Sequence, residues 1–185
     1  TYRDKYVQFD GLLDEMHQSE EDVDFQVRDF NGDGKDEIVF VLLEGTGTGA
    51  CEERLYLFDA DTLTQYDTSD LTERIIARIN STGDDQYFYL SAPGMDRVTI
   101  PKNVAFFPGE QIEFGQIVCY RIEDGKLSCS LGCGVGTLPE YIGDVQVTLS
   151  MDHQGKVNPV SYEYEPYQLP ADSPAAQAST LYQEV

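Results

Sequence analysis

The chain is poor in positive charge and in long apolar stretches. It carries 12 Lys+Arg against 34 Asp+Glu, so its formal net charge is -22. A surface this acidic repels phosphate backbones and anionic membranes, and we expect no nucleic-acid binding. No apolar run reaches the roughly 18 residues that a membrane-spanning helix needs, so we expect no membrane insertion. The charge instead suits divalent cations, basic partners or a solvated surface.

The motifs of several catalytic classes are also missing. There is no tryptophan to stack on a sugar, and the two histidines, His17 and His153, lie far apart in the sequence. No GxSxG nucleophile elbow, GK[ST] phosphate-loop ending or CxxC metal motif occurs. We therefore predict that the chain is not an enzyme. The alternative is an extracellular hydrolase of the acidic-pair glycosidase type, since the many carboxylates do not allow one pair to be singled out.

What the sequence does contain is a short segment rich in oxygen-bearing side chains, DFNGDGKDE at residues 29–37. Oxygen donors at positions 1, 3 and 5, a glycine at 6 and a backbone carbonyl at 7 form a pattern by which one short loop binds calcium. The predicted metal ligands are the side chains of Asp29, Asn31, Asp33 and Glu37 and the carbonyl of Lys35. Asn-Gly and Asp-Gly pairs also favour tight turns, so a turn that binds no metal is the other interpretation.

This segment is not an EF-hand loop. Its twelfth position is Phe40, inside the apolar run 38–43, where an EF-hand has a bidentate Glu, so Glu37 at position 9 would be the last ligand. The pattern DxNGDGxxE followed by a strand resembles the calcium loops of FG-GAP and VCBS repeats, the units of integrin-like β-propellers. The resemblance implies the same ligand set. The chain departs from the family in having one copy, where a propeller needs several, and Glu where family loops more often have Asp.

A wider stretch, residues 24–63, is similar to segments of uncharacterised secreted proteins and lipoproteins of Gram-positive bacteria. There a DG-rich loop precedes a strand, a glycine–threonine loop and a second strand, as in LEGTGTGACEERLYLFDADTL here. The resemblance implies no activity. It favours an extracellular or cell-surface location, as does a calcium loop, because free calcium is plentiful outside cells. We expect that a signal peptide or lipid anchor has been removed from this chain.

The rest of the chain predicts a mainly β (α+β) fold. Apolar residues recur at helical spacing over residues 3–17, where we expect an N-terminal amphipathic helix. Strands are expected at 24–29, 37–44, 53–59, 86–91, 97–100, 111–121, 126–131, 144–151 and 157–164, and 73–79 is a strand or a short helix. We predict an antiparallel sheet, as a meander or sandwich, in one domain over residues 1–165. A Pro/Ala-rich tail or linker follows at 166–185.

Turn residues at 124–125 and 154–155 predict two hairpins, and the first decides where Cys119 lies. A three-residue loop over 123–125 would place Cys119 opposite Cys129, near enough for a disulfide. A two-residue turn at Asp124 and Gly125 would place the two cysteines on opposite faces. The disulfide state stays open for all four cysteines, Cys51, Cys119, Cys129 and Cys133.

These features predict a non-catalytic extracellular or cell-envelope module that calcium stabilises and that acts in binding. Its partners would be proteins or glycans at the cell surface. Tyr87, Phe88 and Tyr89 alternate along one expected strand, so Phe88 should face the core and the two tyrosines the opposite side, where they could contact a partner. A purely structural accessory domain is a further alternative.

Overall fold

The computed structural model describes residues 25–136 and 140–167. Within these ranges the fold is mainly β, as predicted, with strands, one short α-helix and a single 3-10 turn. The elements are β1 (Phe25–Arg28), β2 (Glu37–Gly47), β3 (Ala50–Asp59), β4 (Gln65–Tyr66), α1 (Leu71–Ile76), β5 (Asn80–Gly83), β6 (Tyr87–Ala92), β7 (Met95–Pro101), η2 (Lys102–Val104), β8 (Ile117–Glu123), β9 (Lys126–Val135), β10 (Glu140–Met151) and β11 (Val157–Pro166).

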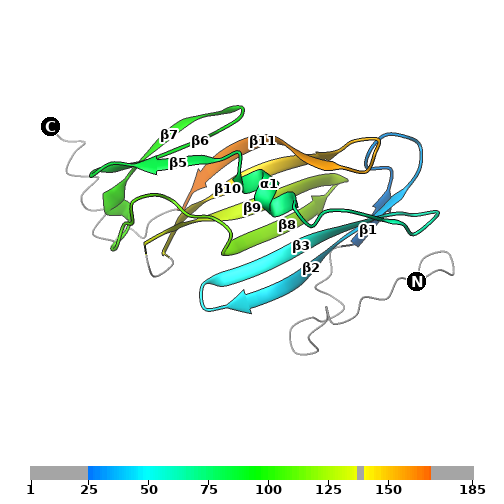
Figure 1. Cartoon of the computed structure of the whole chain (residues 1–185), viewed down its shortest axis with the longest axis horizontal. Coiled ribbons are helices and arrows are strands. Elements are labelled where there is room, and N and C mark those ends of the chain that lie inside the picture. The colour runs from blue at the N-terminus through cyan, green and yellow to red at the C-terminus, as the bar shows by residue number, and fades with distance from the viewer. Residues whose placement is uncertain (1–24, 137–139, 168–185) are drawn as a thin grey trace.

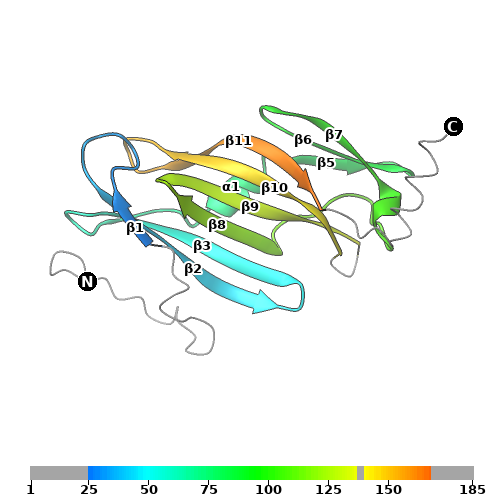
Figure 2. The same ribbon diagram turned by 180° about the vertical axis from the view of Figure 1, so that it is seen from behind.

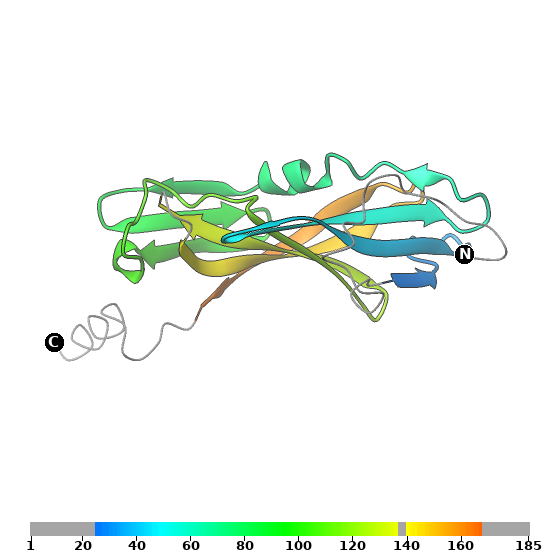
Figure 3. The same cartoon turned by 90° about the horizontal axis from the view of Figure 1, so that it is seen from below.

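The strands form two sheets stacked in layers. The main sheet follows the order β1-β2-β3-β8-β9-β10-β11, and β4 pairs with the second half of β3. Among the described strands, β3 and β8 alone pair in parallel; the other pairs are antiparallel. The small sheet, β5-β6-β7, lies with α1 over one face of the main sheet (Figures 1 and 3), and from behind the main sheet lies in front of α1 (Figure 2).

Apolar side chains are buried on both faces of β2. Val39 and Val41 belong to the main core between the layers, whereas Ile38 and Leu42 belong to a second cluster with Tyr56 of β3. Successive side chains of a strand point to opposite faces. A strand buried on both faces therefore reads as a continuous apolar run, which explains the run at 38–43.

The segment 73–79, expected as a strand or a short helix, contains most of helix α1. Leu71 and Ile75 are buried and lie one turn apart, so they share the face that packs on the core. α1 has six residues, and no helix in the described ranges is both long and apolar enough to cross a membrane. The strand expected at 111–121 begins only at Ile117, and before it Glu113 makes a single bridge to Gly134.

The β8–β9 hairpin uses the two-residue turn. Asp124 and Gly125 have φ values of 49° and 73°, the left-handed conformation that a tight hairpin turn requires. The register pairs Tyr120 with Cys129 and Cys119 with Ser130. The three-residue register is therefore wrong, and Cys119 and Cys129 lie on opposite faces. All four cysteines are free thiols, and Cys129 and Cys133 are buried.

Two predicted segments fall at the edges of the described structure. The N-terminal helix expected over residues 3–17 lies outside the described residues, as do residues 168–185 of the predicted tail. β11 ends at Pro166, which pairs with Gly143, and the hydroxyl of Tyr167 donates to Asp144 Oδ1 at 2.8 Å. Ordered contacts therefore extend into the first residues of the segment expected as a tail.

Candidate functional site

The 29–37 loop joins β1 to β2 and folds around its first aspartate. Gly32 and Gly34 have φ values of +74° and +88°, which other residues rarely adopt. Asp29 Oδ1 accepts the backbone N–H groups of Gly32 at 2.6 Å and Asp33 at 3.1 Å, and its Oδ2 accepts that of Gly34 at 2.9 Å. These bonds, above all the one from Gly34, lower the pKa of Asp29, so its carboxylate is charged at neutral pH.

Glu37 closes the loop from the first position of β2. It is 1% exposed; its Oε2 accepts the N–H of Phe30 at 2.8 Å, and its Oε1 accepts the side-chain amide of Asn31 at 3.1 Å. Burial raises the pKa of Glu37, and the charges of Asp33 and Asp29 raise it further. A cation placed among these groups would favour the charged form of the buried carboxylate.

Asn31 lies between two other predicted ligands. Its Nδ2 donates to Asp33 Oδ2 at 3.3 Å and to Glu37 Oε1, while its Oδ1 accepts the N–H of Asp33 at 2.9 Å. The N–H of Lys35 donates to Asp33 Oδ1 at 2.9 Å. The side-chain amide nitrogen of Asn31 thus holds the carboxylates of Asp33 and Glu37 near each other. Within the described residues, Asp29, Asp33 and Glu37 do not bring one oxygen each within 4.8 Å of one another.

The residues of this loop fit calcium in their chemistry, but the three carboxylates would have to come closer together to hold one ion. Every predicted ligand offers an oxygen, as a hard cation requires. A cation between Asp33 and Glu37 would require Asn31 to turn its amide oxygen toward the two carboxylates, in place of Nδ2. Mutual repulsion of the acids would then be replaced by attraction to the ion.

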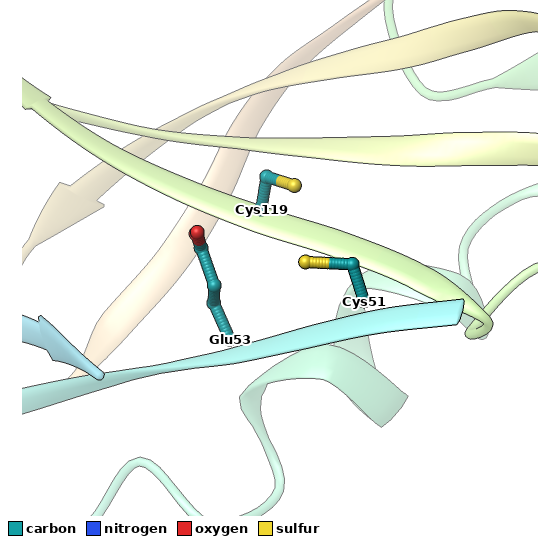
Figure 4. A group of neighbouring side chains, drawn as sticks. All are labelled: Cys51, Glu53 and Cys119. Atoms are coloured by element: carbon teal, nitrogen blue, oxygen red, sulfur yellow. The ribbon is translucent and has the colours of Figure 1, made fainter. Parts of the chain in front are cut away.

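A second cluster joins β3 to β8. A sulfur each from Cys51 and Cys119 and a carboxylate oxygen of Glu53 all lie within 4.8 Å of one another (Figure 4). Glu53 Oε2 accepts the N–H of Tyr120 at 2.7 Å and Arg121 Nη1 at 3.3 Å. Burial, followed by the charge of Glu53, raises the pKa of Cys119 to about 11, so this thiol is protonated at neutral pH.

Sequence reasoning missed this cluster because its parts are distant in the chain. It weighed Cys119 only against Cys129, its neighbour across the hairpin. The sequence does hold one signal, because Cys51 and Glu53 are two positions apart and would point to the same side of a strand. Their partner Cys119 follows only from the pairing of β3 with β8, and nothing local predicts a parallel pair between strands so far apart.

A groove beside the small sheet gathers exposed aromatic and acidic side chains. It is lined by residues 106–111, by Glu113 and by Gly136; we call it the 106–113 groove. Phe106 and Phe107 are 73% and 70% exposed. Glu110 and Glu113 line the same groove, so it combines apolar surface with two carboxylates.

The aromatic triplet on β6 has the predicted alternation. Phe88 is fully buried, whereas Tyr87 is 37% exposed, and the rings of Tyr87 and Tyr89 lie 6.4 Å apart. Polar neighbours hold Tyr89, since its hydroxyl donates to Asp84 Oδ2 at 2.6 Å and Arg97 lies over its ring at 4.1 Å. Tyr89 is therefore held by this surface network, and the 106–113 groove offers the more exposed aromatic surface.

Comparison with known proteins gives no relative from which a function could be transferred. No family model matches the chain, and neither the curated proteins nor the solved structures gave a match. A functional conclusion therefore has to come from the two clusters and the groove themselves.

Proposed function

We propose that the chain is a non-catalytic extracellular or cell-envelope module that calcium stabilises and that acts by binding a partner. The observation that carries the calcium part is the position of Glu37, a buried carboxylate at the end of a loop that also presents Asp29, Asn31 and Asp33. Burial and the two neighbouring acids disfavour the charged form of the Glu37 carboxylate. A cation held by the same oxygens would offset this cost, and the carbonyl of Lys35 would complete the ligand set.

Calcium in this loop would hold a turn and would not do chemistry. Five protein ligands leave few positions for a substrate, and a catalytic metal needs such open positions. Extracellular modules bind calcium with dissociation constants of about 0.1–1 mM. The proposed location is consistent with so weak a site, because it would be filled where calcium is abundant.

The test is thermal unfolding of the metal-free chain with and without about 5–10 mM calcium. This concentration is roughly tenfold above the dissociation constant of a weak extracellular calcium site. Binding to the native state alone raises the melting temperature. Asp33→Ala should abolish the increase. Asp36→Ala is the matched control, because it removes a carboxylate from the same loop outside the ligand set, and it should keep the increase. An unchanged melting curve for the wild type would contradict the calcium part of the proposal.

For the partner, the 106–113 groove supports a basic protein segment. Phe106 and Phe107 offer apolar surface, and Glu110 and Glu113 add negative charge in a chain of net charge -22. Complementary charge attracts a cationic segment, and the attraction weakens with salt. A glycan stacking on the two phenylalanines is the other occupant that the test must separate.

The groove is tested by calorimetric titration with a synthetic Lys/Leu peptide and with neutral oligosaccharides. The proposal expects salt-sensitive binding of the peptide. A Phe106→Ala/Phe107→Ala variant should lose it, and Val160→Ala, at a residue 59% exposed on β11, should keep it. Binding of an oligosaccharide in place of the peptide would identify a glycan-binding module. Binding of neither would remove the groove from the proposal.

The hydrolase alternative has one observation in its favour, the presence of two carboxylates, Glu110 and Glu113, in one groove. A glycosidase needs two such groups about 5–10 Å apart. Glycoside substrates offered to the wild type should show no turnover if the module is non-catalytic. Turnover that Glu110→Gln or Glu113→Gln removes, with unchanged thermal unfolding, would establish the enzyme.

A further inference from the structure

Along the strand order β1-β2-β3-β8-β9-β10-β11, the fewest residue pairs connect β3 and β8. Two residue pairs connect these strands, Cys51 with Ile117 and Glu52 with Val118, and the N–H of Cys51 donates to Gln116 O at 2.8 Å. By contrast, β8 pairs with β9 over six residue pairs. This β3–β8 join connects the β1-β2-β3 half of the sheet to the β8–β11 half, so any group that bridges it would couple the two halves.

Three metal-ligating side chains meet at the β3–β8 join. Cys51 and Glu53 come from β3 and Cys119 from β8, and Figure 4 shows the side chains of Cys51 and Glu53 extending from β3 toward β8, which carries Cys119. Their ligand atoms lie within 4.8 Å of one another. Around a tetrahedral zinc ion, with bonds of about 2.0–2.3 Å, such atoms lie about 3.3–3.8 Å apart. Side-chain rotations that move the ligand atoms by on the order of an ångström would therefore give tetrahedral zinc geometry.

Glu53 is already oriented for this role by its neighbours. The N–H of Tyr120 and Arg121 Nη1 both donate to its Oε2, at 2.7 Å and 3.3 Å. Hydrogen bonds of this kind fix the direction of metal-binding carboxylates. Its side chain is 18% exposed, and both cysteines are half-buried, so an ion and a water molecule have access.

The register disfavours a disulfide between the same two cysteines. Cys51 is paired with Ile117, so Cys119 lies two residues out of register with it. Diagonal neighbours of this kind are about 7–8 Å apart at Cα. The Cα atoms of disulfide-bonded cysteines are usually about 4.4–6.8 Å apart. A metal ion bridges a wider gap than a direct sulfur–sulfur bond, and it can use Glu53 as well.

We propose that Cys51, Glu53 and Cys119 form a binding site for a thiophilic divalent cation of the zinc type, which ties β3 to β8. Thiolate and carboxylate ligands suit Zn²⁺, and with three protein ligands a water molecule takes the fourth position. Two thiol protons pass to solvent as two metal–sulfur bonds form, and no electron is transferred. This site is separate from the calcium loop in position and in ligand chemistry.

The test titrates the reduced, metal-free full chain with Zn²⁺ and with Cd²⁺. One equivalent of Cd²⁺ should produce a thiolate-to-metal charge-transfer band, and Zn²⁺ should raise the melting temperature. Cys51→Ala and Cys119→Ala should each remove the band. Glu53→Gln should weaken binding by at least about tenfold. Glu52→Gln makes the same charge change at the exposed neighbouring residue and should leave binding unchanged.

Alkylation of the wild type keeps the proposal testable if a variant does not fold. Bound Zn²⁺ should protect Cys51 and Cys119 from a maleimide, as read by mass spectrometry of peptides. A band that persists in both cysteine variants, or equal alkylation of these two cysteines with and without Zn²⁺, would overturn the proposal. So would a Cys51–Cys119 disulfide formed in air that leaves no metal affinity after reduction.

Discussion

The two candidate cation sites lie at opposite ends of β3 and are built in opposite ways. Glu37 of the 29–37 loop pairs with Asp59 at the end of β3, whereas Cys51 stands at its start. Eight residues of strand separate them, about 26 Å. The loop takes its donors from nine consecutive residues, and the cluster takes its donors from two strands whose pairing the fold alone creates.

The difference extends to the chemistry of the donors. The loop offers oxygen alone, with one carboxylate held charged by backbone N–H groups and another buried at some cost. The cluster offers two sulfurs and one carboxylate. Hard cations such as calcium select the first set, and borderline or soft cations select the second. If both sites bind metal as proposed, they select different ions and do not compete with each other.

The largest effect is expected from removing one acid of each site, Glu37 or Glu53, in the absence of metal. Glu37→Ala should lower the free energy of unfolding by about 2–3 kcal/mol, because it leaves the N–H of Phe30 and the amide of Asn31 unsatisfied beside a cavity. Glu53→Ala should cost about 1–2 kcal/mol, because it removes the acceptor of Tyr120 N–H at a more exposed site. Urea unfolding measures both. A larger loss for Glu53→Ala would reverse the ranking of the two sites.

The next largest effect is the stabilisation that each ion gives to a variant of the other site, which shows whether the two sites are independent. Calcium should stabilise Cys119→Ala as much as the wild type, and Zn²⁺ should stabilise Asp33→Ala as much as the wild type. Changes in the free energy of unfolding at sites this far apart are additive to within about 0.5 kcal/mol. Melting curves with each ion and with both ions give the coupling. Loss of both responses in either variant would show that the two regions form one site or unfold as one unit.

A smaller effect concerns the hairpin that sets the position of Cys119. Gly125→Ala should destabilise the chain by about 1 kcal/mol, because residue 125 has a positive φ. Its added Cβ would also meet the flexible side chain of Arg28. The zinc response should weaken with it, since Cys119 lies on the same hairpin, while the calcium response should not. Chemical denaturation with each ion measures this, and equal weakening of both would contradict the local role of the turn.

The smallest effect is expected from removing residues 168–185. Both sites consist of residues in the described ranges, and a Pro/Ala-rich segment of this composition is expected to contribute little stability. The truncated chain should therefore keep both metal responses and nearly the same melting temperature. A loss of several degrees would show that this segment is an integral part of the domain.

The sequence predicted what depends on neighbouring residues. The apolar run at 38–43, the Asp124-Gly125 turn and the alternation of Tyr87 and Phe88 all appear in the structure as local chemistry dictates. The loop residues were found in the same way, since their pattern is contained in nine positions.

What the sequence could not give depends on distant pairing. Residues 73–79 carry apolar groups that suit either a strand or a helix, and the burial of Leu71 and Ile75 against the core is consistent with the helix. The same residues allow a three-residue loop or a two-residue turn, and the strand register differs by one residue between them. The φ values of Asp124 and Gly125 identify the two-residue turn. The parallel β3–β8 join, which brings Cys119 to Cys51 and Glu53, has no signature in either strand alone.

We propose that the 29–37 loop binds calcium with its own side chains. Calorimetric titration of the metal-free chain with calcium tests it most directly. We expect one binding event with a dissociation constant of about 0.1–1 mM, lost in Asp33→Ala and kept in Asp36→Ala. No heat of binding at 5–10 mM calcium (about ten times the weakest constant expected), or the same binding in Asp33→Ala, would contradict it.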